Sequence, residues 1–147
     1  MNHCWTYQNN AIKDLQNYEL KKTSVEGMQE RIKELEARFI KLGGASGEPV
    51  QGGASKSEDN LANNIDERNR LTTNIESVER HIARVERGLA ALDRDERLVL
   101  EKFYINRPSR YLDWLCDNLH CEQATVYRIK DRAIYKFTLA MYGLVDA

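Results

Sequence analysis

The sequence has no long apolar run, few cysteines and almost no net charge. None of its apolar runs reaches the roughly 20 residues that a membrane-spanning helix needs. The first five residues lack the basic segment followed by an apolar core that marks a secretory signal. Its three cysteines are an odd number, and two of them fall at apolar positions of expected helices, which favours a reducing compartment over a disulfide framework. We therefore expect a cytoplasmic protein that does not contact a membrane.

The sequence also lacks the patterns on which catalysis or metal binding would depend. It has no phosphate-binding glycine loop, and no histidine has a serine or cysteine partner at a recognisable spacing. Asp113 and Asp117 lie one turn apart, but such surface acids are usually solvated. His3-Cys4 and His120-Cys121 lack the paired cysteine spacing of a zinc site. We predict no enzymatic activity, no metal and no cofactor.

Charge is balanced, with 22 basic and 23 acidic residues and a net charge of -1. A protein of this composition has no global basic signature, so any nucleic-acid binding must depend on a local arrangement of side chains. Glycine is concentrated in one place: five of the eight glycines lie in residues 43–57, together with one of the two prolines. We interpret this segment as a flexible linker.

Two long stretches with heptad spacing flank this linker. A first short helix is expected to end near Lys22. Thr23 and Glu26 then form a capping-box pattern that predicts the start of a new helix, which is expected to stop at Gly43-Gly44. The second stretch is expected from about Ser57 to Leu92. Apolar residues alternate spacings of three and four in both stretches: Val25, Met28, Ile32, Leu35, Phe39 and Leu42, then Leu71, Ile75, Val78, Ile82, Val85, Leu89 and Leu92.

The two heptad stretches predict an antiparallel coiled-coil hairpin within a helical arm of residues 1–92. Leu61 and Ile65 precede the second series in a slipped phase. The same seam would also suit a second copy of the chain, so a homo-oligomer through the arm stays open. The outer face is dense in mixed charge, so we interpret Arg80, Arg84 and Arg87 as a solvated surface rather than a track for DNA.

The remainder, residues 93–147, predicts a bundle of short helices that contains a helix-turn-helix. Asp93 and Glu96 form a second capping box, and Asn106-Arg107-Pro108 should end the helix that they begin. Two apolar stripes follow, separated only by residues 120–124: Leu112, Leu115, Cys116 and Leu119, then Val126, Ile129, Ala133, Phe137 and Met141. The whole chain is therefore predicted to be all-α.

The apolar series of residues 92–137, with Thr125-Val126-Tyr127-Arg128 at the start of the second helix, resembles region 4 of sigma-70-type factors. The coiled-coil arm and the ending Met141-Tyr142-Gly143 are similar to the ArpU and RinA class of phage-encoded late-gene transcription regulators. The resemblance implies a recognition helix that enters the major groove of double-stranded DNA, and it introduces host RNA polymerase as a further partner. Three residues depart from the sigma-like pattern: Trp114, His120 and Glu122.

Carried over by position, the resemblance implies two groups of DNA contacts. Arginine can make two hydrogen bonds to guanine and glutamine two to adenine, whereas phosphate contacts fix the register of a protein on DNA without reading its sequence. The base-reading group is Gln123, Ala124, Tyr127 and Arg128, and the backbone group is Arg110, Thr125, Lys130 and Arg132. Lys130 and Arg132 are equally well interpreted as ordinary solvated charges, and Glu122 would oppose a phosphate.

These observations favour a sequence-specific DNA-binding transcription regulator of a phage or prophage, acting in the cytoplasm of the bacterial host. One alternative is a DNA-packaging protein that resembles a small terminase subunit. Proteins of that kind usually place the DNA-binding unit first, whereas here it comes last. Another alternative is a coiled-coil adaptor whose C-terminal bundle binds only protein, and such a protein would show no salt-dependent affinity for DNA.

Overall fold

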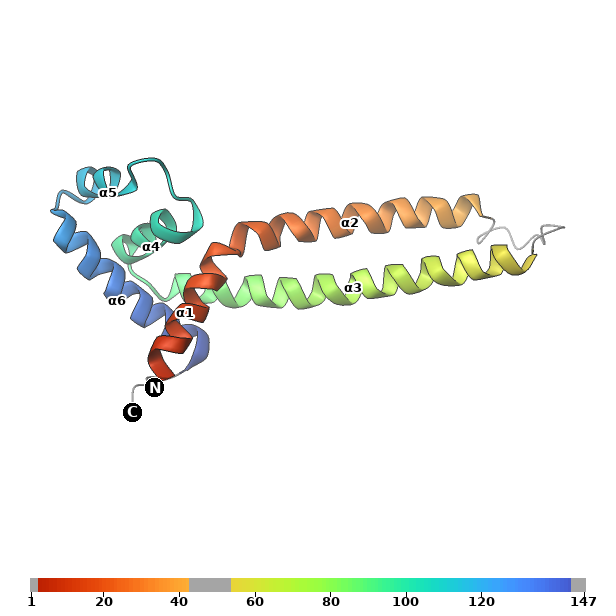
Figure 1. Ribbon diagram of the computed structural model, residues 1–147, viewed down its shortest axis with the longest axis horizontal. Coiled ribbons are helices and arrows are strands. Elements are labelled where there is room, and N and C mark those ends of the chain that lie inside the picture. Colours follow the sequence, from red (N-terminus) through yellow and green to blue (C-terminus); the bar gives the residue numbers. More distant parts are fainter. Residues whose placement is uncertain (1–2, 43–53, 144–147) are drawn as a thin grey trace. The chain divides into compact units, whose positions relative to one another are not determined.

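A computed structural model describes residues 3–42 and 54–143 (Figure 1). Every regular element in these ranges is a helix, which confirms the predicted all-α fold class. Contacts divide the chain into two units: residues 22–80 form one, and residues 1–21 together with 81–147 form the other. Most of the predicted linker lies outside the described residues. In the described part of the chain, no helix is both long and apolar enough to cross a membrane.

The first three helices differ from the expectation at two boundaries. They are α1 (His3–Gln16), α2 (Tyr18–Lys41) and α3 (Ala54–Ala90). The predicted helix start at Thr23 is wrong, because the interruption falls at Asn17, between the buried Leu15 and the half-buried Tyr18. The predicted start of the second long helix near Ser57 is also late, because α3 already includes Ala54. A capping-box pattern on an exposed helix surface therefore did not mark a boundary here.

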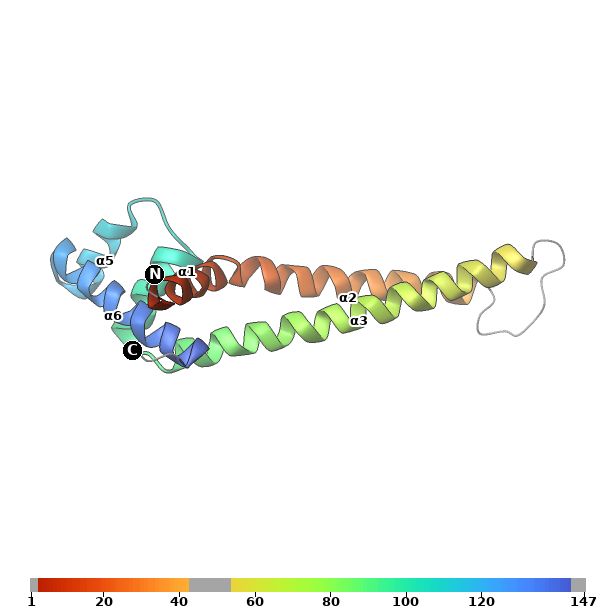
Figure 2. The ribbon, with the colours of Figure 1, turned by 60° about the horizontal axis from the view of Figure 1, so that its bottom comes forward.

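Residues 22–80 form an antiparallel hairpin of α2 and α3, as predicted. The two helices run side by side in both ribbon views (Figures 1 and 2). Arg31 on α2 donates to Glu67 on α3 at 3.1 Å, and Leu35, further along α2, accepts from Asn64, earlier on α3. This decreasing order of partners defines the antiparallel direction. The seam is only partly buried. Val25 and Leu35 are buried, whereas Met28, Ile32 and Phe39 are half-buried.

The seam of α3 keeps one phase along its length, which corrects the predicted slip. Asn64 and Arg68 occupy the positions between Leu61 and Leu71, so the spacing of three and four is not interrupted. Asn64 is 6% exposed, whereas Ile65 is 40% exposed and lies outside the seam. The Asn64 amide donates to the Leu35 carbonyl at 2.7 Å and accepts from Arg68 Nε at 2.9 Å. Polar residues thus fill two seam positions, and their hydrogen bonds make this possible.

The C-terminal unit contains four further elements: α4 (Arg94–Leu100), a π-helical turn η1 (Glu101–Ile105), α5 (Tyr111–Leu119) and α6 (Gln123–Tyr142). The capping box that begins α4 is confirmed. Asp93 accepts from the Glu96 backbone N–H at 2.8 Å, and Glu96 accepts from the Asp93 backbone N–H at 3.1 Å. The predicted end of this helix before Pro108 is also confirmed.

One buried cluster joins α1, the end of α3, α4 and α6. Its members include Leu15, Val85, Leu92, Leu100 and Phe137. The cluster extends the C-terminal unit beyond the predicted boundary after Leu92, because α1 and the last turns of α3 contribute side chains to it. Close packing here depends on Gly88: a Cβ at this position would lie 2.7 Å from the Phe137 ring.

Polar contacts fasten the end of α6 to the same unit. The Tyr142 hydroxyl donates to Asp14 on α1, and His81 Nε2 lies 3.1 Å from the same carboxylate. Burial and the hydrogen bond to Asp14 raise the pKa of Tyr142 to about 12. Arg84 donates to the Met141 carbonyl at 3.2 Å, so this arginine, although exposed, helps to satisfy the C-terminus of α6.

Candidate nucleic-acid interface

The four predicted base-reading residues share the exposed side of the first turns of α6. Gln123, Ala124, Tyr127 and Arg128 are all exposed, and Tyr127 retains 41% of its accessible surface. Positions one, four and five residues apart on a helix form one contiguous surface. The adjoining side of α6 is buried, because Val126 is fully inaccessible and packs with Leu115 of α5. The structure therefore brings these four residues together on the outer side of a supported helix.

The connection between α5 and α6 is a three-residue turn, residues 120–122. His120 adopts a left-handed conformation with φ 53° and ψ 48°, which favours glycine. The Cys121 N–H donates to the Cys116 carbonyl at 3.2 Å and closes the turn. Cys116, Leu119 and Cys121 pack against the buried cluster of Val99, Phe103, Leu115 and Val126. The chain therefore makes this sharp turn with histidine at a position that favours glycine, at the cost of local backbone strain.

Glu122 is the residue before α6, and its side chain makes no capping hydrogen bond. It is exposed at the end of the helix that carries the four base-reading candidates. A carboxylate at this position interacts favourably with the helix dipole but repels a phosphate. This residue therefore favours the fold of α6 and weakens any contact of the same helix end with a nucleic-acid backbone.

Aromatic rings connect α6 to the loop before α5. The Tyr127 and Phe103 ring centroids are 5.9 Å apart, and those of Phe103 and Tyr111 are 5.1 Å apart, both pairs in edge-to-face geometry. Arg107 stacks on Tyr111, with its guanidinium carbon 3.9 Å from the ring centroid. These contacts hold the exposed Arg107 in a defined position relative to the surface of α6.

Arg110 and Lys130, two of the predicted backbone-contact residues, each pair with a neighbouring acidic residue. Arg110 donates to Asp113 at 3.2 Å, although its side chain is 82% exposed. Lys130 lies 2.8 Å from Asp131. Burial alone would lower the pKa of Lys130, but the hydrogen bond to Asp131 and the nearby tyrosines raise it, so the ammonium group stays charged. The exposed ion pair of Arg110 is weak enough for a phosphate to replace the carboxylate, whereas the Lys130 side chain is only 22% exposed.

Arg132 is engaged more firmly, within the fold itself. Its Nε donates at 3.1 Å to Glu96, whose side chain is fully buried, and Lys136 donates to the same carboxylate at 3.1 Å. Burial alone would raise the pKa of Glu96. Hydrogen bonds from the Asp93 backbone, Lys136 and Arg132 outweigh it and lower that pKa to about 2. Arg132 is therefore a structural partner of α4, and any contact with phosphate would use only the exposed part of its guanidinium.

Arg107 is the basic residue of this surface that sequence reasoning missed. The sequence pattern places it only in the helix break before Pro108. The available signal was its spacing: Arg107 precedes Tyr111 by four residues across the turn into α5, and Phe103 precedes Arg107 by four. Only the observed ring contacts show that this spacing produces a stack.

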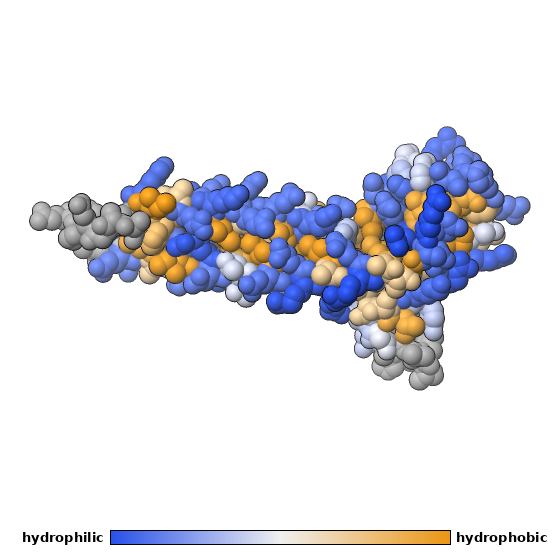
Figure 3. Space-filling view, turned by 180° about the vertical axis from the view of Figure 1, so that it is seen from behind, coloured by the Kyte–Doolittle hydropathy of each residue, from blue (hydrophilic) through white to orange (hydrophobic). Residues whose placement is uncertain are grey.

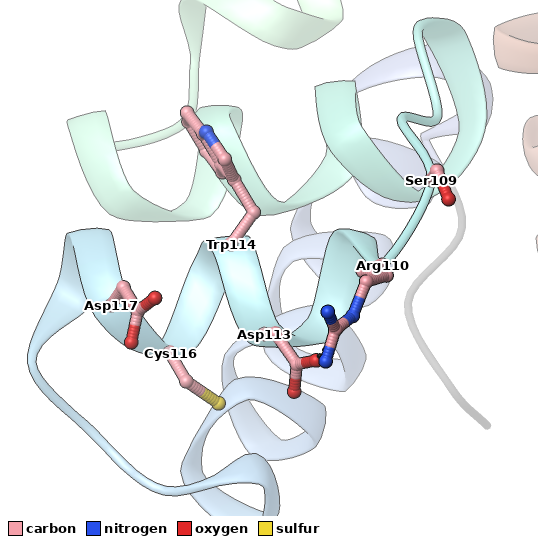
Figure 4. A pocket seen from close by; sticks show the side chains of 6 residues that line it. All are labelled: Ser109, Arg110, Asp113, Trp114, Cys116 and Asp117. Carbon is pink, nitrogen blue, oxygen red and sulfur yellow. Dashed lines mark hydrogen bonds and ion pairs between the residues drawn. The ribbon is translucent and has the colours of Figure 1, made fainter.

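A separate surface hollow lies beside α5, lined by Ser109, Arg110, Asp113, Trp114, Cys116 and Asp117 (Figure 4). Asp113 points toward Arg110, whereas Trp114 and Cys116 leave the helix in different directions. Burial raises the pKa of the Cys116 thiol, so it remains protonated and a weak nucleophile at neutral pH. Across the described ranges, no group of three or more histidine, cysteine or acidic side chains could hold a metal ion.

Together these features define a class: an all-helical protein with a helical hairpin and a helix-turn-helix near its C-terminus. The chain belongs to the DUF1492 family, described as a protein of unknown function, and the match covers residues 41–138. That range contains α3 and the helices through most of α6. Neither a curated protein nor a solved structure matches the chain.

Proposed function

We propose that the protein is a sequence-specific DNA-binding transcription regulator of the phage or prophage late-gene type, with α6 as the recognition helix in the major groove. The observation that supports this proposal best is the exposed side of α6, on which Gln123, Ala124, Tyr127 and Arg128 lie together. Their side chains match the chemistry of base edges. The other side of this helix is fixed by the buried packing of α4, η1 and α5.

The proposal gives each neighbouring group a role in binding double-stranded DNA. Arg128 and Gln123 read base edges, and Tyr127 supplies an apolar contact. Arg107, Arg110, Thr125 and Lys130 contact phosphates, and the exposed part of Arg132 assists them. The similarity to sigma-70 region 4 and to the ArpU and RinA class supports a promoter-proximal role in which host RNA polymerase is a second partner. The C-terminal position of the helix-turn-helix favours this regulator over a small-terminase-like packaging protein.

The test is binding of the purified full chain to fragments of the phage or prophage genome that encodes it, across a salt series. We expect the wild type to select one fragment. Arg128→Ala should abolish that selection and leave weak binding that falls steeply with salt, because phosphate contacts remain. Loss of one two-hydrogen-bond contact to a base should weaken specific binding by about 1–3 kcal/mol.

Arg87→Ala is the matched control, because Arg87 is an exposed arginine on α3 that the proposal assigns no contact. It should bind and select as the wild type does. If the wild type prefers no fragment and Arg128→Ala behaves identically, the proposal fails. The helix-turn-helix would then be a purely structural bundle, and the protein-binding adaptor would replace the regulator.

A further inference from the structure

The two flanks of the α2–α3 hairpin differ in how their charges are used. On one flank, Arg31 immediately precedes the seam residue Ile32. It donates to Glu67 of α3 at 3.1 Å, which joins the two helices, and to Glu34 of its own helix at 3.2 Å. The exposed Asn74 lies on this same flank, because it also immediately precedes a seam residue, Ile75. This flank is closed by pairing within the chain.

The opposite flank follows the seam residues Leu35 and Asn64. In an antiparallel pair of heptad helices, the positions that follow these residues lie on one common side. We call this side the neutral flank and define it by six exposed residues: Gln29, Lys33, Glu36 and Ile40 of α2, with Ile65 and Thr72 of α3. Ile40 is 64% exposed and Ile65 is 40% exposed. Such large apolar side chains would be better buried.

The seam beside these residues is also incompletely covered. Ile32 is half-buried and, with Gln29, Lys33 and Glu36, lines a surface hollow. The space-filling view shows apolar side chains in a strip along the hairpin, bordered by polar ones (Figure 3). Two helices alone do not bury their heptad residues here. A helical partner on the neutral flank would complete the layer, as in a four-helix bundle.

The charges of the neutral flank indicate which partner covers it. Between Gln29 and Ile40 of α2, the charged residues on this flank are Lys33 and Glu36, and neither forms an ion pair with another described residue. They are three residues apart on the same helix. A two-fold axis that passes between them, perpendicular to α2, places Lys33 of one copy beside Glu36 of the other, twice over. A surface with one positive and one negative group so arranged is complementary to itself.

We propose that the neutral flank is a two-fold dimerisation surface, on which the α2 helices of two copies of this chain pack antiparallel and Lys33 of each copy pairs with Glu36 of its partner. This inference is independent of the proposed function. The contact buries Ile40 and Ile65 and covers the open side of the Ile32 seam. The intramolecular bonds of Asn64 and Arg31 remain in place, so the hairpin of each copy is retained.

The experiment measures the mass of the full chain by light scattering and sedimentation equilibrium over a range of concentrations. We expect a dimer. Lys33→Glu and Glu36→Lys should each weaken the dimer at least about tenfold, because each places like charges together twice. An equimolar mixture of these two variants should form a heterodimer, and the double variant with both exchanges should dimerise again. Ile65→Lys should also dissociate the dimer.

Asn74→Glu is the matched control, since it adds a charge at an exposed position of the flank that Arg31 and Glu67 close. It should leave the mass unchanged, and helix content measured by circular dichroism identifies any variant that fails to fold. A wild-type monomer at all concentrations would overturn the proposal, as would a dimer indifferent to Lys33→Glu, Glu36→Lys and Ile65→Lys. A ring of many subunits would also overturn it and would favour the packaging alternative.

Discussion

The side chain of Glu96 connects α4 with α6. Its carboxylate completes the capping box with Asp93, and it also accepts from Arg132 and Lys136 on α6, so the start of α4 is bound to the middle of α6. Removing a buried carboxylate that pairs with several charged donors strongly destabilises the folded state, because the donors lose their partner. The side chain is therefore an anchor for the helix that the proposed function places on DNA.

Glu96→Gln should destabilise the protein in a pH-dependent way. The folded-state pKa of Glu96 is about 2, lowered from 4.5, so its ionisation contributes stability above pH ~5 that is lost as the pH falls toward 2. We expect the free energy of unfolding at pH 7 to fall by about 2–4 kcal/mol in the variant. The difference from the wild type should shrink steadily in acid, as measured by denaturant unfolding at several pH values.

Glu101→Gln provides the control for this prediction. Glu101 is a half-exposed glutamate of the same segment, and its oxygen lies 4.0 Å from Lys102 Nζ. Its replacement should cost less than about 1 kcal/mol at any pH. If the wild-type and Glu96→Gln stability curves stay parallel between neutral and acid pH, the charged hydrogen bonds of Glu96 do not stabilise the fold.

At the scale of elements, the hairpin depends on a polar residue in an apolar position. Asn64 donates to the Leu35 carbonyl of the opposite helix, and this bond forms only when Asn64 lies beside Leu35. Its second bond, from Arg68, lies within α3 and satisfies the amide oxygen. A single asparagine in a coiled-coil seam commonly selects one register at a cost in stability. We infer that Asn64 selects the register of α2 on α3.

Asn64→Leu should therefore raise the thermal stability of the hairpin by about 1 kcal/mol while making its register less specific. Thermal melts followed by circular dichroism measure the first effect, and the appearance of more than one species in sedimentation measures the second. Asn63→Leu, at the exposed neighbouring position, should change neither. A lower melting temperature in Asn64→Leu would show instead that the two hydrogen bonds outweigh the apolar surface gained.

At the scale of the whole molecule, charge balance limits how the protein can bind DNA. A net charge of -1 provides no long-range attraction to a polyanion, so affinity must come from a few cations on one surface. Arg107 is one such cation, because its stack on Tyr111 fixes its guanidinium beside the candidate recognition helix.

Arg107→Ala should weaken DNA binding equally for all fragments and leave the choice among them unchanged. Loss of one phosphate contact should reduce the magnitude of the slope of log affinity against log salt by about 1, as measured by fluorescence anisotropy. Arg107→Lys keeps the charge but loses the planar stack, so we expect an intermediate effect. An unaltered salt slope in Arg107→Ala would remove this residue from the interface and leave the assignment of Arg128 untouched.

Much of the fold could be predicted because its determinants are local in the chain. The heptad spacings of α2 and α3, the capping box of Asp93 and Glu96, and the break before Pro108 each depend on residues within one or two turns of one another. The same is true of the exposed side of α6, since helical periodicity alone places Gln123, Ala124, Tyr127 and Arg128 together.

Tertiary packing decided the features whose partners are distant in the chain. Glu96 meets Arg132 across 36 residues, Asn64 meets Leu35 across 29, and Asp14 meets Tyr142 across 128. Periodicity reports which side of a helix is apolar, but it does not report which other helix covers that side. Sequence alone therefore determined that the chain is helical and which side of α6 is exposed. Only the folded chain decided that Arg132 supports α4, that Asn64 belongs to the seam, and that α1 packs with the C-terminal helices.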